Sequence, residues 1–295
     1  TLQNNTASGG GGGISITGNT TNITMTDSAI VGNQATGAGG GINLGLGTGT
    51  IDVSRSRFAG NTTGSTGSAI NNASGTVTAE NNWWGCQGLP GAAGCQTTSG
   101  TVDSDPRLEL RLSASPASIA ANGTSTLTAD LRFNTSNQQQ AANTFGNTTV
   151  TFAPGSLGSV PSPTAGFSAG LATATFQAGA TTGSTNPTVT LDNGSAQTTV
   201  NIQPGPTADA GADQNVDDTD GNGVQDVTLD GSGSSAPAGS IVSYVWQEGA
   251  TQVATGVTPT LNNVAVGGHT YTLTVTDNLG ATDSDTVNVT VDDVT

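Results

Sequence analysis

The sequence predicts an all-β protein, and three observations support this fold class. A block at residues 11–14 (GGGI) returns at residues 39–42 (GGGI) and again at 67–70 (GSAI), 28 residues apart each time. Thr, Ser, Asn, Gly and Val dominate, and no long segment has the 3.6-residue periodicity of a helix. After the repeats, short segments of alternating polar and apolar residues are separated by turn residues, which is typical of antiparallel sandwiches.

The repeated block predicts stacked structural units. Residues 2–6 correspond to 30–34 and 58–62, and residues 23–25 correspond to 51–53. Short alternating strands with Gly and Asn turns in each period favour coils of β-strands over pairs of helices. Inward aliphatic side chains then form ladders, so Ile14, Ile42 and Ile70 should lie one above another. The glycine run at residues 9–13 lacks the residues of a phosphate loop and is interpreted as a loop tip.

Charge and length restrict the function classes. The chain has 295 residues, enough for two or three domains, and a net charge of −16 from 21 acidic residues, five Arg and no Lys. Such a field repels nucleic acid and anionic lipid and suits cations. No apolar run is long enough to span a membrane, so we expect no membrane insertion. The chain opens inside a repeat without a signal peptide, and we expect processing, truncation or further residues upstream.

Two cysteines and two tryptophans mark the end of the repeats. Cys86 and Cys95 flank a flexible loop and lack a nearby His, which argues against zinc and favours a disulfide formed in an oxidising, extracytoplasmic compartment. The alternative is a pair of reduced, inert thiols. Trp83 and Trp84 are interpreted as a plug over the apolar interior of the last coil, with a carbohydrate platform as the alternative.

Three resemblances follow from these motifs. Residues 1–106, ending in NNWWGC at 81–86, Cys95 and VDSDP at 102–106, resemble right-handed parallel β-helices of the pectate-lyase-like class in secreted and cell-surface proteins. Residues 107–203 resemble a bacterial immunoglobulin-like (Ig-like) sandwich of the invasin and intimin type. After the stiff linker at 204–206 (PGP), the segment to 295 resembles a PKD-type Ig-like sandwich, carried by VTLDGSGS at 227–234, IVSYVW at 241–246 and HTYTLTVTD at 269–277. These resemblances imply a β-helix followed by two Ig-like sandwiches.

An acidic loop in the last segment is the candidate metal site. Asp218, Asp220, Asn222 and Asp226 occupy positions 1, 3, 5 and 9, with Gly223 at position 6 and the Val224 carbonyl at position 7. This is the ligand spacing of a calcium loop, similar to dockerin and thrombospondin repeats. Leu229 stands where a bidentate Glu belongs, so Asp217 or Asp230 would have to complete the shell. Calcium is the predicted cofactor, and a solvated acidic hairpin is the alternative.

The remaining candidate residues give weaker signals. Arg55 and Arg57, two apart on an expected strand, suggest an acidic-glycan contact or a solvated edge guard, and Trp246 and His269 are interpreted as structural. With scattered carboxylates and no activated base nearby, we expect no enzymatic activity. Asn-x-Ser/Thr sequons supply possible glycosylation sites: Asn19, Asn22, Asn61, Asn72, Asn122, Asn134, Asn147, Asn193 and Asn288.

Together these features predict an extracellular structural or adhesive protein of a cell surface. Its partners would be other copies of itself or glycans of a neighbouring surface. Two assemblies stay open: a monomeric stalk, or the repeating subunit of a filament in which an uncapped β-helix end docks on the next copy. The alternative function is a carbohydrate-binding or polysaccharide-degrading secreted enzyme. Both the setting and the function depend on the family resemblances.

Overall fold

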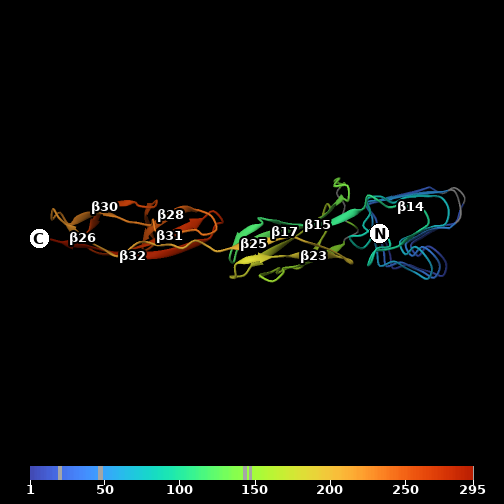
Figure 1. Ribbon diagram of the computed structural model, residues 1–295, viewed down its shortest axis with the longest axis horizontal. Helices are drawn as coiled ribbons and strands as arrows, with labels where there is room; N and C mark the ends of the chain where they lie inside the picture. Colours follow the sequence, from blue (N-terminus) through green and yellow to red (C-terminus); the bar gives the residue numbers. More distant parts are fainter. Residues whose placement is uncertain (19–21, 46–48, 142–144, 146–147, 295) are drawn as a thin grey trace. The chain divides into compact units, whose positions relative to one another are not determined.

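The computed structural model describes residues 1–18, 22–45, 49–141, 145 and 148–294, and every regular element in this part is a β-strand (Figure 1). Across these residues we find no helix with the length and apolar character needed to cross a membrane. The chain divides into two compact units. The first comprises Thr1–Pro116, Ser125–Phe176 and Thr185–Val200, and the second Ala117–Thr124, Gln177–Ser184 and Asn201–Thr295.

The first unit begins with a stack of β-coils. Each of the first three coils supplies one short strand to each of four parallel sheets, and the last coil supplies β13 and β14 to two of them. The orders are β1-β5-β9, β10-β6-β2, β13-β11-β7-β3 and β14-β12-β8-β4. The strands are β1 (Leu2–Gln3), β2 (Thr6–Ala7), β3 (Ile14–Ile16), β4 (Ile23–Thr26), β5 (Ala29–Val31), β6 (Gln34–Ala35), β7 (Ile42–Leu44), β8 (Thr50–Ser54), β9 (Arg57–Ala59), β10 (Thr62–Thr63), β11 (Ile70–Asn72), β12 (Thr76–Thr78), β13 (Thr98–Ser99) and β14 (Val102–Asp103).

The coil register confirms the predicted ladder. Ile14 pairs with Ile42, and Ile42 pairs with Ile70, all in parallel strands. The period is not constant, because 26 residues separate Ile51 from its partner Val77 and 25 separate Val77 from Val102. The later coils therefore use shorter turns in this ladder. The parallel β-helix of the predicted fold class is correct, and its pectate-lyase-like character stays a prediction.

The repeated glycines belong to the stack itself. Gly11, Gly39 and Gly67 have φ of 76°, 73° and 66°, in the left-handed region that favours glycine. A Cβ on any of them would lie 2.2–2.4 Å from the carbonyl oxygen of the isoleucine three residues later. Gly11 and Gly12 are also buried, so the interpretation of residues 9–13 as a loop tip is wrong for this part of the run. A tight turn within each coil therefore requires glycine at this position, and at Gly12 the next coil leaves no room either, since a Cβ there would lie 2.4 Å from the Gly40 carbonyl oxygen.

An asparagine ladder runs along the stack at one turn. Asn5 Nδ2 donates to Asn33 Oδ1 at 2.9 Å, and Asn33 Nδ2 donates to Asn61 Oδ1 at 3.0 Å. The same oxygens accept the backbone N–H of the residue one coil earlier, and Gln96 Oε1 accepts the N–H of Asn61. Asn33 and Asn61 are buried. Each amide therefore satisfies backbone and side-chain groups that a tight buried turn would otherwise leave unpaired.

The interior of the stack is aliphatic and ends in aromatic rings. Ile30, Leu44, Val53 and Ile70 are fully buried within one apolar cluster. At its C-terminal end, Trp84 stacks on Phe58 with ring centroids 4.9 Å apart and planes at 13°.

Between the stack and the last sandwich, the strands form three antiparallel or mixed sheets. The first has the order β15-β17-β21-β19, formed by Leu108–Ser115, Thr124–Asn134, Leu171–Ala178 and Gly158–Ser159. The second has the order β20-β18-β23-β24, formed by Thr164–Gly166, Thr149–Ala153, Thr188–Leu191 and Gly194–Gln197. The third has the order β16-β25-β22, formed by Ser118–Ala120, Val200–Gln203 and Gly183–Thr185. Alternation along β21, whose even-numbered residues are buried, is what the sequence predicts for a sandwich strand.

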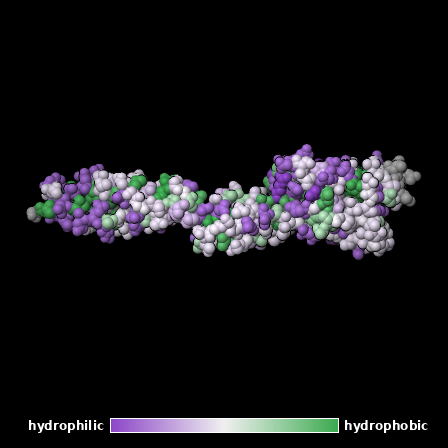
Figure 2. Space-filling model, in the orientation of Figure 1, coloured by the Kyte–Doolittle hydropathy of each residue, from purple (hydrophilic) through white to green (hydrophobic). Residues whose placement is uncertain are grey.

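The second unit ends in another sandwich, of which β26, β28, β30, β31 and β32 are labelled in Figure 1. A five-stranded sheet has the order β26-β32-β31-β28-β29, formed by Gln214–Asp218, Thr282–Asp293, Gly267–Asp277, Ile241–Glu248 and Thr251–Thr255. A two-stranded sheet pairs β27 (Val224–Thr228) with β30 (Thr260–Ala265). Trp246 is fully buried in the core, as predicted, and its Nε1 donates to the Gly256 carbonyl at 3.1 Å. Hydrophilic residues cover most of the visible face around β26 and β30 (Figure 2).

Candidate functional site

The last coil and a sandwich hairpin meet at a carboxylate that is largely shielded from solvent. Asp192, at the turn between β23 and β24, has a φ of 52°. It accepts hydrogen bonds from Arg57 Nε at 2.9 Å and from Trp83 Nε1 at 2.8 Å, and its second oxygen pairs with the same guanidinium. The side chain of Asp192 is 13% exposed and that of Arg57 is 15% exposed. A bidentate pair sheltered from water is among the stronger polar contacts in a protein.

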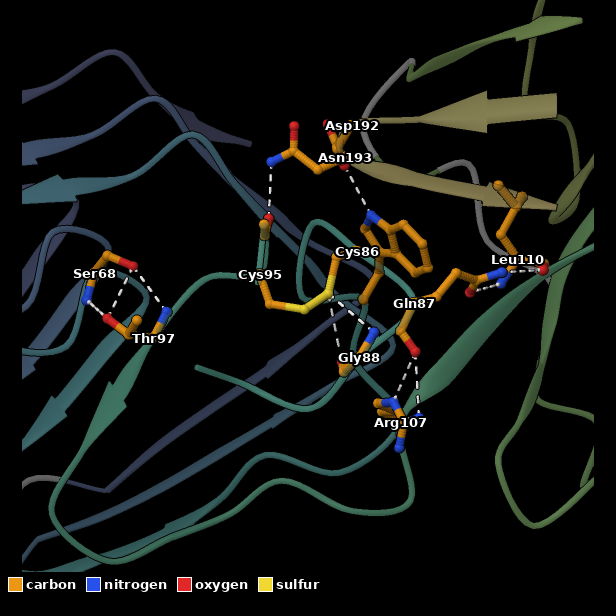
Figure 3. Close-up of a disulfide and its surroundings, with 12 residues drawn as sticks. Ser68, Cys86, Gln87, Gly88, Cys95, Thr97, Arg107, Leu110, Asp192 and Asn193 are labelled. Atoms are coloured by element: carbon orange, nitrogen blue, oxygen red, sulfur yellow. Dashed lines mark hydrogen bonds between the residues drawn. A yellow bond between two sulfur atoms is a disulfide. The ribbon is translucent and has the colours of Figure 1, made fainter. Parts of the chain in front are cut away.

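The disulfide loop forms the other half of this junction. Cys86 and Cys95 are bonded, with Cα atoms 4.9 Å apart, which confirms the predicted disulfide. Between them, Gln87 donates to the Leu110 carbonyl at 2.6 Å and accepts the Leu110 N–H at 3.0 Å, so it pairs like one more strand residue (Figure 3). Asn193 Nδ2 donates to the Gly94 carbonyl at 2.8 Å. The loop is therefore held from both β15 and the β23–β24 hairpin.

The two tryptophans at this end are structural. Trp83 and Trp84 are both 0% exposed. The plug interpretation is confirmed for Trp84, which belongs to the apolar cluster of the stack, whereas Trp83 contacts the sandwich hairpin. The carbohydrate-platform alternative is wrong because neither ring reaches the surface. Gly194 lies against the Trp83 ring, where an added Cβ would come within 2.5 Å of it.

The prediction that Arg55 and Arg57 share a strand face is wrong. Strand β8 ends at Ser54, Arg55 lies in a turn with a φ of 48°, and β9 begins at Arg57. Arg55 donates to both carboxylate oxygens of Asp27 at 2.9 and 3.0 Å, and this bonding raises the pKa of its guanidinium. Arg57 is committed to Asp192. Both guanidiniums therefore already pair with carboxylates of the chain, and the glycan contact and the edge guard stay predictions.

The acidic loop of the last sandwich is a self-bonded turn. The buried Asp218 carboxylate accepts the N–H groups of Gly221 at 3.1 Å and Gly223 at 2.7 Å. The Gly223 N–H is the main reason that the pKa of Asp218 is lowered. Asp220 accepts the Asn222 N–H, and Asn222 accepts the Val224 N–H. The turn thus has internal partners for the acceptors that were predicted to bind calcium.

Four of the five predicted calcium ligands still meet at one surface hollow. Asp220, Asn222, Val224 and Asp226 line it together with Gln225 and Asn263, and its volume is about 260 Å³. Asp218 does not line it. Over the described ranges of the chain, no three His, Cys, Asp or Glu side chains are arranged to hold a metal ion. Calcium binding therefore stays a prediction, and it would need the loop to rearrange around its carboxylates.

Burial separates the predicted sequons into groups. Asn61, Asn72 and Asn134 are buried, and their amides donate to Ile30, Thr101 and Asn81, so glycosylation of the folded chain at these three is excluded. The exposed sites, where glycosylation stays a prediction, are Asn22, Asn122, Asn193 and Asn288. Asn19 and Asn147 lie outside the described residues.

His269 has a partner that the sequence did not reveal. Its Nδ1 lies 2.6 Å from Glu248 Oε1, and its Nε2 lies 2.9 Å from the Ala265 carbonyl oxygen. The bond to Glu248 is the main reason that the pKa of His269 is raised. The partners come from β28 and from the end of β30, so their meeting depends on the sheet order. Asp192 was missed for the same reason, because its partner Arg57 lies 135 residues away.

Comparison with known proteins identifies the family of the last sandwich. Residues 210–291 match the K319L-like PKD domain family, so the PKD resemblance predicted for this segment is confirmed. The solution structure of the PKD domain from KIAA 1837 protein is 32% identical to this chain, covers 28% of it and 83% of its own chain, and has a TM-score of 0.24. None of the curated proteins compared with the chain matches it.

A fragment of intimin and a bacterial adhesin are among the similar solved structures. A C-terminal fragment of intimin in complex with the intimin-binding domain of its translocated receptor is 17% identical, with 59% of this chain and 61% of that chain covered and a TM-score of 0.33. The adhesin InvE of Yersinia pseudotuberculosis is 20% identical, with 62% and 58% covered and a TM-score of 0.23. The chain thus spans about three fifths of these two relatives. The described protein is all-β, with β-helix coils followed by Ig-like sandwiches of which the last is PKD-like.

Proposed function

We propose that this chain is an extracellular structural or adhesive protein of a cell surface. The observation that carries the proposal is the junction of the last coil, the disulfide loop and the β23–β24 hairpin. There, Asp192 bonds both Arg57 and Trp83, and Gln87 pairs with Leu110. A coil stack fixed in this way to a sandwich is a rigid support, as a surface protein that presents further modules needs.

The bonded cysteines support the extracellular part of the proposal. Disulfides persist in oxidising compartments and are rare in reducing ones. Loops closed by a disulfide also lose less entropy on folding, which helps a chain that works without cytoplasmic chaperones. The adhesive part rests on the kind of modules present, which is an analogy at the level of fold.

Surface labelling of intact cells tests this proposal. An antibody raised against residues 204–295 should stain intact producing cells, and protease added outside should remove the signal. Deleting the corresponding gene should reduce attachment between cells or to a surface. Signal that appears only after cells are opened, with unchanged attachment in the deletion strain, would contradict the proposal.

Assembly into a filament is a finer version of the same proposal. The coils stack by a parallel register that any further coil can extend, whichever chain supplies it. Their C-terminal end is occupied by Trp83, Trp84 and the chain's own hairpin. A filament would therefore join the first coil of one copy to a different surface of the next. Electron microscopy and light scattering over a concentration series test this, and a constant monomer mass would favour the stalk.

A further inference from the structure

We propose that the last sandwich binds a neutral sugar residue in a pocket between its two sheets, lined by β30, the end of β28 and the start of β31. This inference deepens the adhesive function proposed above by naming a site and a ligand class. The three strands are labelled in Figure 1. The pocket has a volume of about 470 Å³, within the range of about 300–1,000 Å³ that is usual for small-molecule sites.

The floor of the pocket is apolar. It is formed by Val253, Leu261, Val264 and the ring of Tyr271, and the last three of these are less than 10% exposed. The imidazole of His269 lies parallel to the Tyr271 ring, with planes at 7° and centroids 6.0 Å apart. A sugar presents C–H groups on the face of its ring, and an apolar floor with aromatic edges matches that face.

The Tyr271 side chain contributes a hydroxyl to this pocket. Tyr271 is 2% exposed as a whole residue, and its hydroxyl makes no hydrogen bond to the residues the structure describes. Among these residues, the buried polar atoms that lack a partner belong to Asn72 and Trp84, so the Tyr271 oxygen keeps contact with solvent. Burial of the ring is the main reason that the pKa of this phenol is raised. A tyrosine hydroxyl at the edge of an apolar surface usually bonds water or a ligand. A ligand hydroxyl in the pocket, able both to donate and to accept, would supply that partner.

The rim of the pocket carries further polar side chains that can still form hydrogen bonds. Asn262 and Asn263 are exposed on β30, and their side-chain amides make no hydrogen bond in the described part of the chain. Asn263 has a φ of 57°, and its N–H donates to Asp226, which fixes the backbone at this point. Glu248 uses one carboxylate oxygen for His269. Its other oxygen and the two amides therefore offer both acceptors and donors to vicinal hydroxyls.

Charge selects a neutral ligand over a charged one. Residues 204–295 contain 13 acidic residues and no Lys or Arg, so an anionic sugar would meet a repulsive field. A cation would be attracted by that field, but inside the pocket it would compete with His269 for the Glu248 carboxylate. The His269–Glu248 pair thus leaves the pocket itself close to neutral. A neutral hexose has the polarity and the lack of charge that these groups require.

Titration of the 15N-labelled chain with methyl glycosides of glucose, galactose and mannose and with N-acetylglucosamine tests the site. Saturable shifts are expected at backbone amides of residues 260–271, with dissociation constants on the order of millimolar for so small a ligand. Glucuronate and arginine ethyl ester serve as the anionic and cationic comparison probes. They are expected to cause no saturable shift in this pocket.

Two conservative variants locate the binding. Tyr271→Phe keeps the ring and removes only the hydroxyl, and should weaken binding several-fold. Glu248→Gln keeps the shape and removes the charge, and should weaken it about tenfold. Tyr244→Phe, at the other tyrosine of the chain and outside the pocket, is the matched control and should bind as the unaltered chain does.

Three results would overturn the sugar site. They are the absence of saturable shifts with every neutral glycoside, unchanged affinity in Tyr271→Phe, and saturation by arginine ethyl ester or glucuronate alone. Because surface labelling measures where the protein is, positive labelling with a failed titration would reject the pocket and leave the proposed surface function standing.

Discussion

The coil stack and the last sandwich satisfy their backbone polar groups with different side chains. In the coils, neutral amides do this work, as in the ladder of Asn5, Asn33 and Asn61. In the last sandwich, nine carboxylates accept backbone N–H groups instead: Asp209, Asp213, Asp218, Asp220, Asp226, Asp230, Asp277, Asp283 and Asp285. Residues 1–106 contain five acidic residues and two Arg, against 13 acidic residues and no basic ones in residues 204–295.

Geometry explains this difference. Adjacent strands in a parallel stack lie about 4.8 Å apart, and two carboxylates at that spacing would repel each other by about 3 kcal/mol at an effective dielectric constant of about 20. Amides can stack there because each one both donates and accepts. The carboxylates of the sandwich are spread over separate turns and strand ends, where each can serve N–H groups alone. A periodic fold therefore favours Asn at positions where a sandwich tolerates Asp.

Acid should separate the two regions most strongly. The pKa of Asp218 is lowered chiefly by the Gly223 N–H, and that of Asp230 by Ser232. A carboxyl whose folded pKa is lowered adds stability above its unfolded pKa of about 3.9, and this stability is lost as the pH falls through the folded value. The last sandwich should therefore unfold in acid before the coils. Trp246 fluorescence and coil amide resonances measure the two events, and coincident transitions would contradict this account.

The reverse dependence is expected around His269. Glu248 raises its folded pKa, so its contribution is complete below about pH 6.5, the ordinary value for His, and is lost as the pH rises through the raised value. An NMR titration of the imidazole protons should give a midpoint above the ordinary value, and Glu248→Gln should lower it.

Within the coils, Asn33→Asp should be the most damaging single change. It places a charge in a buried ladder and removes the Nδ2 donor to Asn61 and to the Leu2 carbonyl. The expected loss of unfolding free energy is about 3–5 kcal/mol, measured by chemical denaturation. Asn22→Asp is the control, because Asn22 is exposed and accepts the Thr50 N–H, which a carboxylate does equally well. If the two changes lower the unfolding free energy equally, the buried ladder contributes no more stability than an exposed asparagine.

At the junction, Asp192→Asn should cost about 1–3 kcal/mol, because it leaves the sheltered Arg57 without its counter-charge. Asp105→Asn is the matched control, since Asp105 pairs with Arg107 but its side chain is 60% exposed, and its loss should cost less than about 1 kcal/mol. Denaturation of both variants in the same buffer makes the comparison. A larger loss of unfolding free energy for Asp105→Asn than for Asp192→Asn would show that the junction does not contribute more stability than an exposed ion pair.

Calcium should have the smallest effect. If the acidic loop binds it with a dissociation constant near 1 mM, then 10 mM calcium would add about 1.4 kcal/mol and raise the melting temperature of the last sandwich by about 6–11 °C. Asp220→Ala should remove this rise, and Asp52→Ala in the coils should not. A melt unchanged by calcium and by chelator would leave the loop as a hydrogen-bonded turn.

Sequence reasoning succeeded where the signal was periodic or local. The 28-residue repeat placed Ile14, Ile42 and Ile70 in register, and the loop between Cys86 and Cys95 was short enough to close. The asparagine ladder has the same 28-residue spacing, since Asn5, Asn33 and Asn61 occupy equivalent positions. The spacing alone does not indicate that their amides bond one another, or that Asn33 and Asn61 are buried.

The failures came from backbone direction and from distant partners. Arg55 and Arg57 looked like one strand because the left-handed turn at Arg55 has no signature in a non-glycine residue. Asp192 and Glu248 find their partners through sheet order, which local patterns do not encode. Three sequons were misjudged for a related reason, since the tripeptide pattern does not indicate that Asn61, Asn72 and Asn134 point into the protein.

The Asp192 carboxylate has a mechanical consequence. Because one side chain bonds a guanidinium from β9 and an indole from the final coil, twisting the hairpin on the stack must stretch these bonds together rather than one after another. Bonds strained in parallel share an applied torque, and they yield at a higher force than the same bonds strained in series. A force applied to the sandwich, such as the drag of flowing liquid, would therefore reach the coil stack with little rotation of the hairpin.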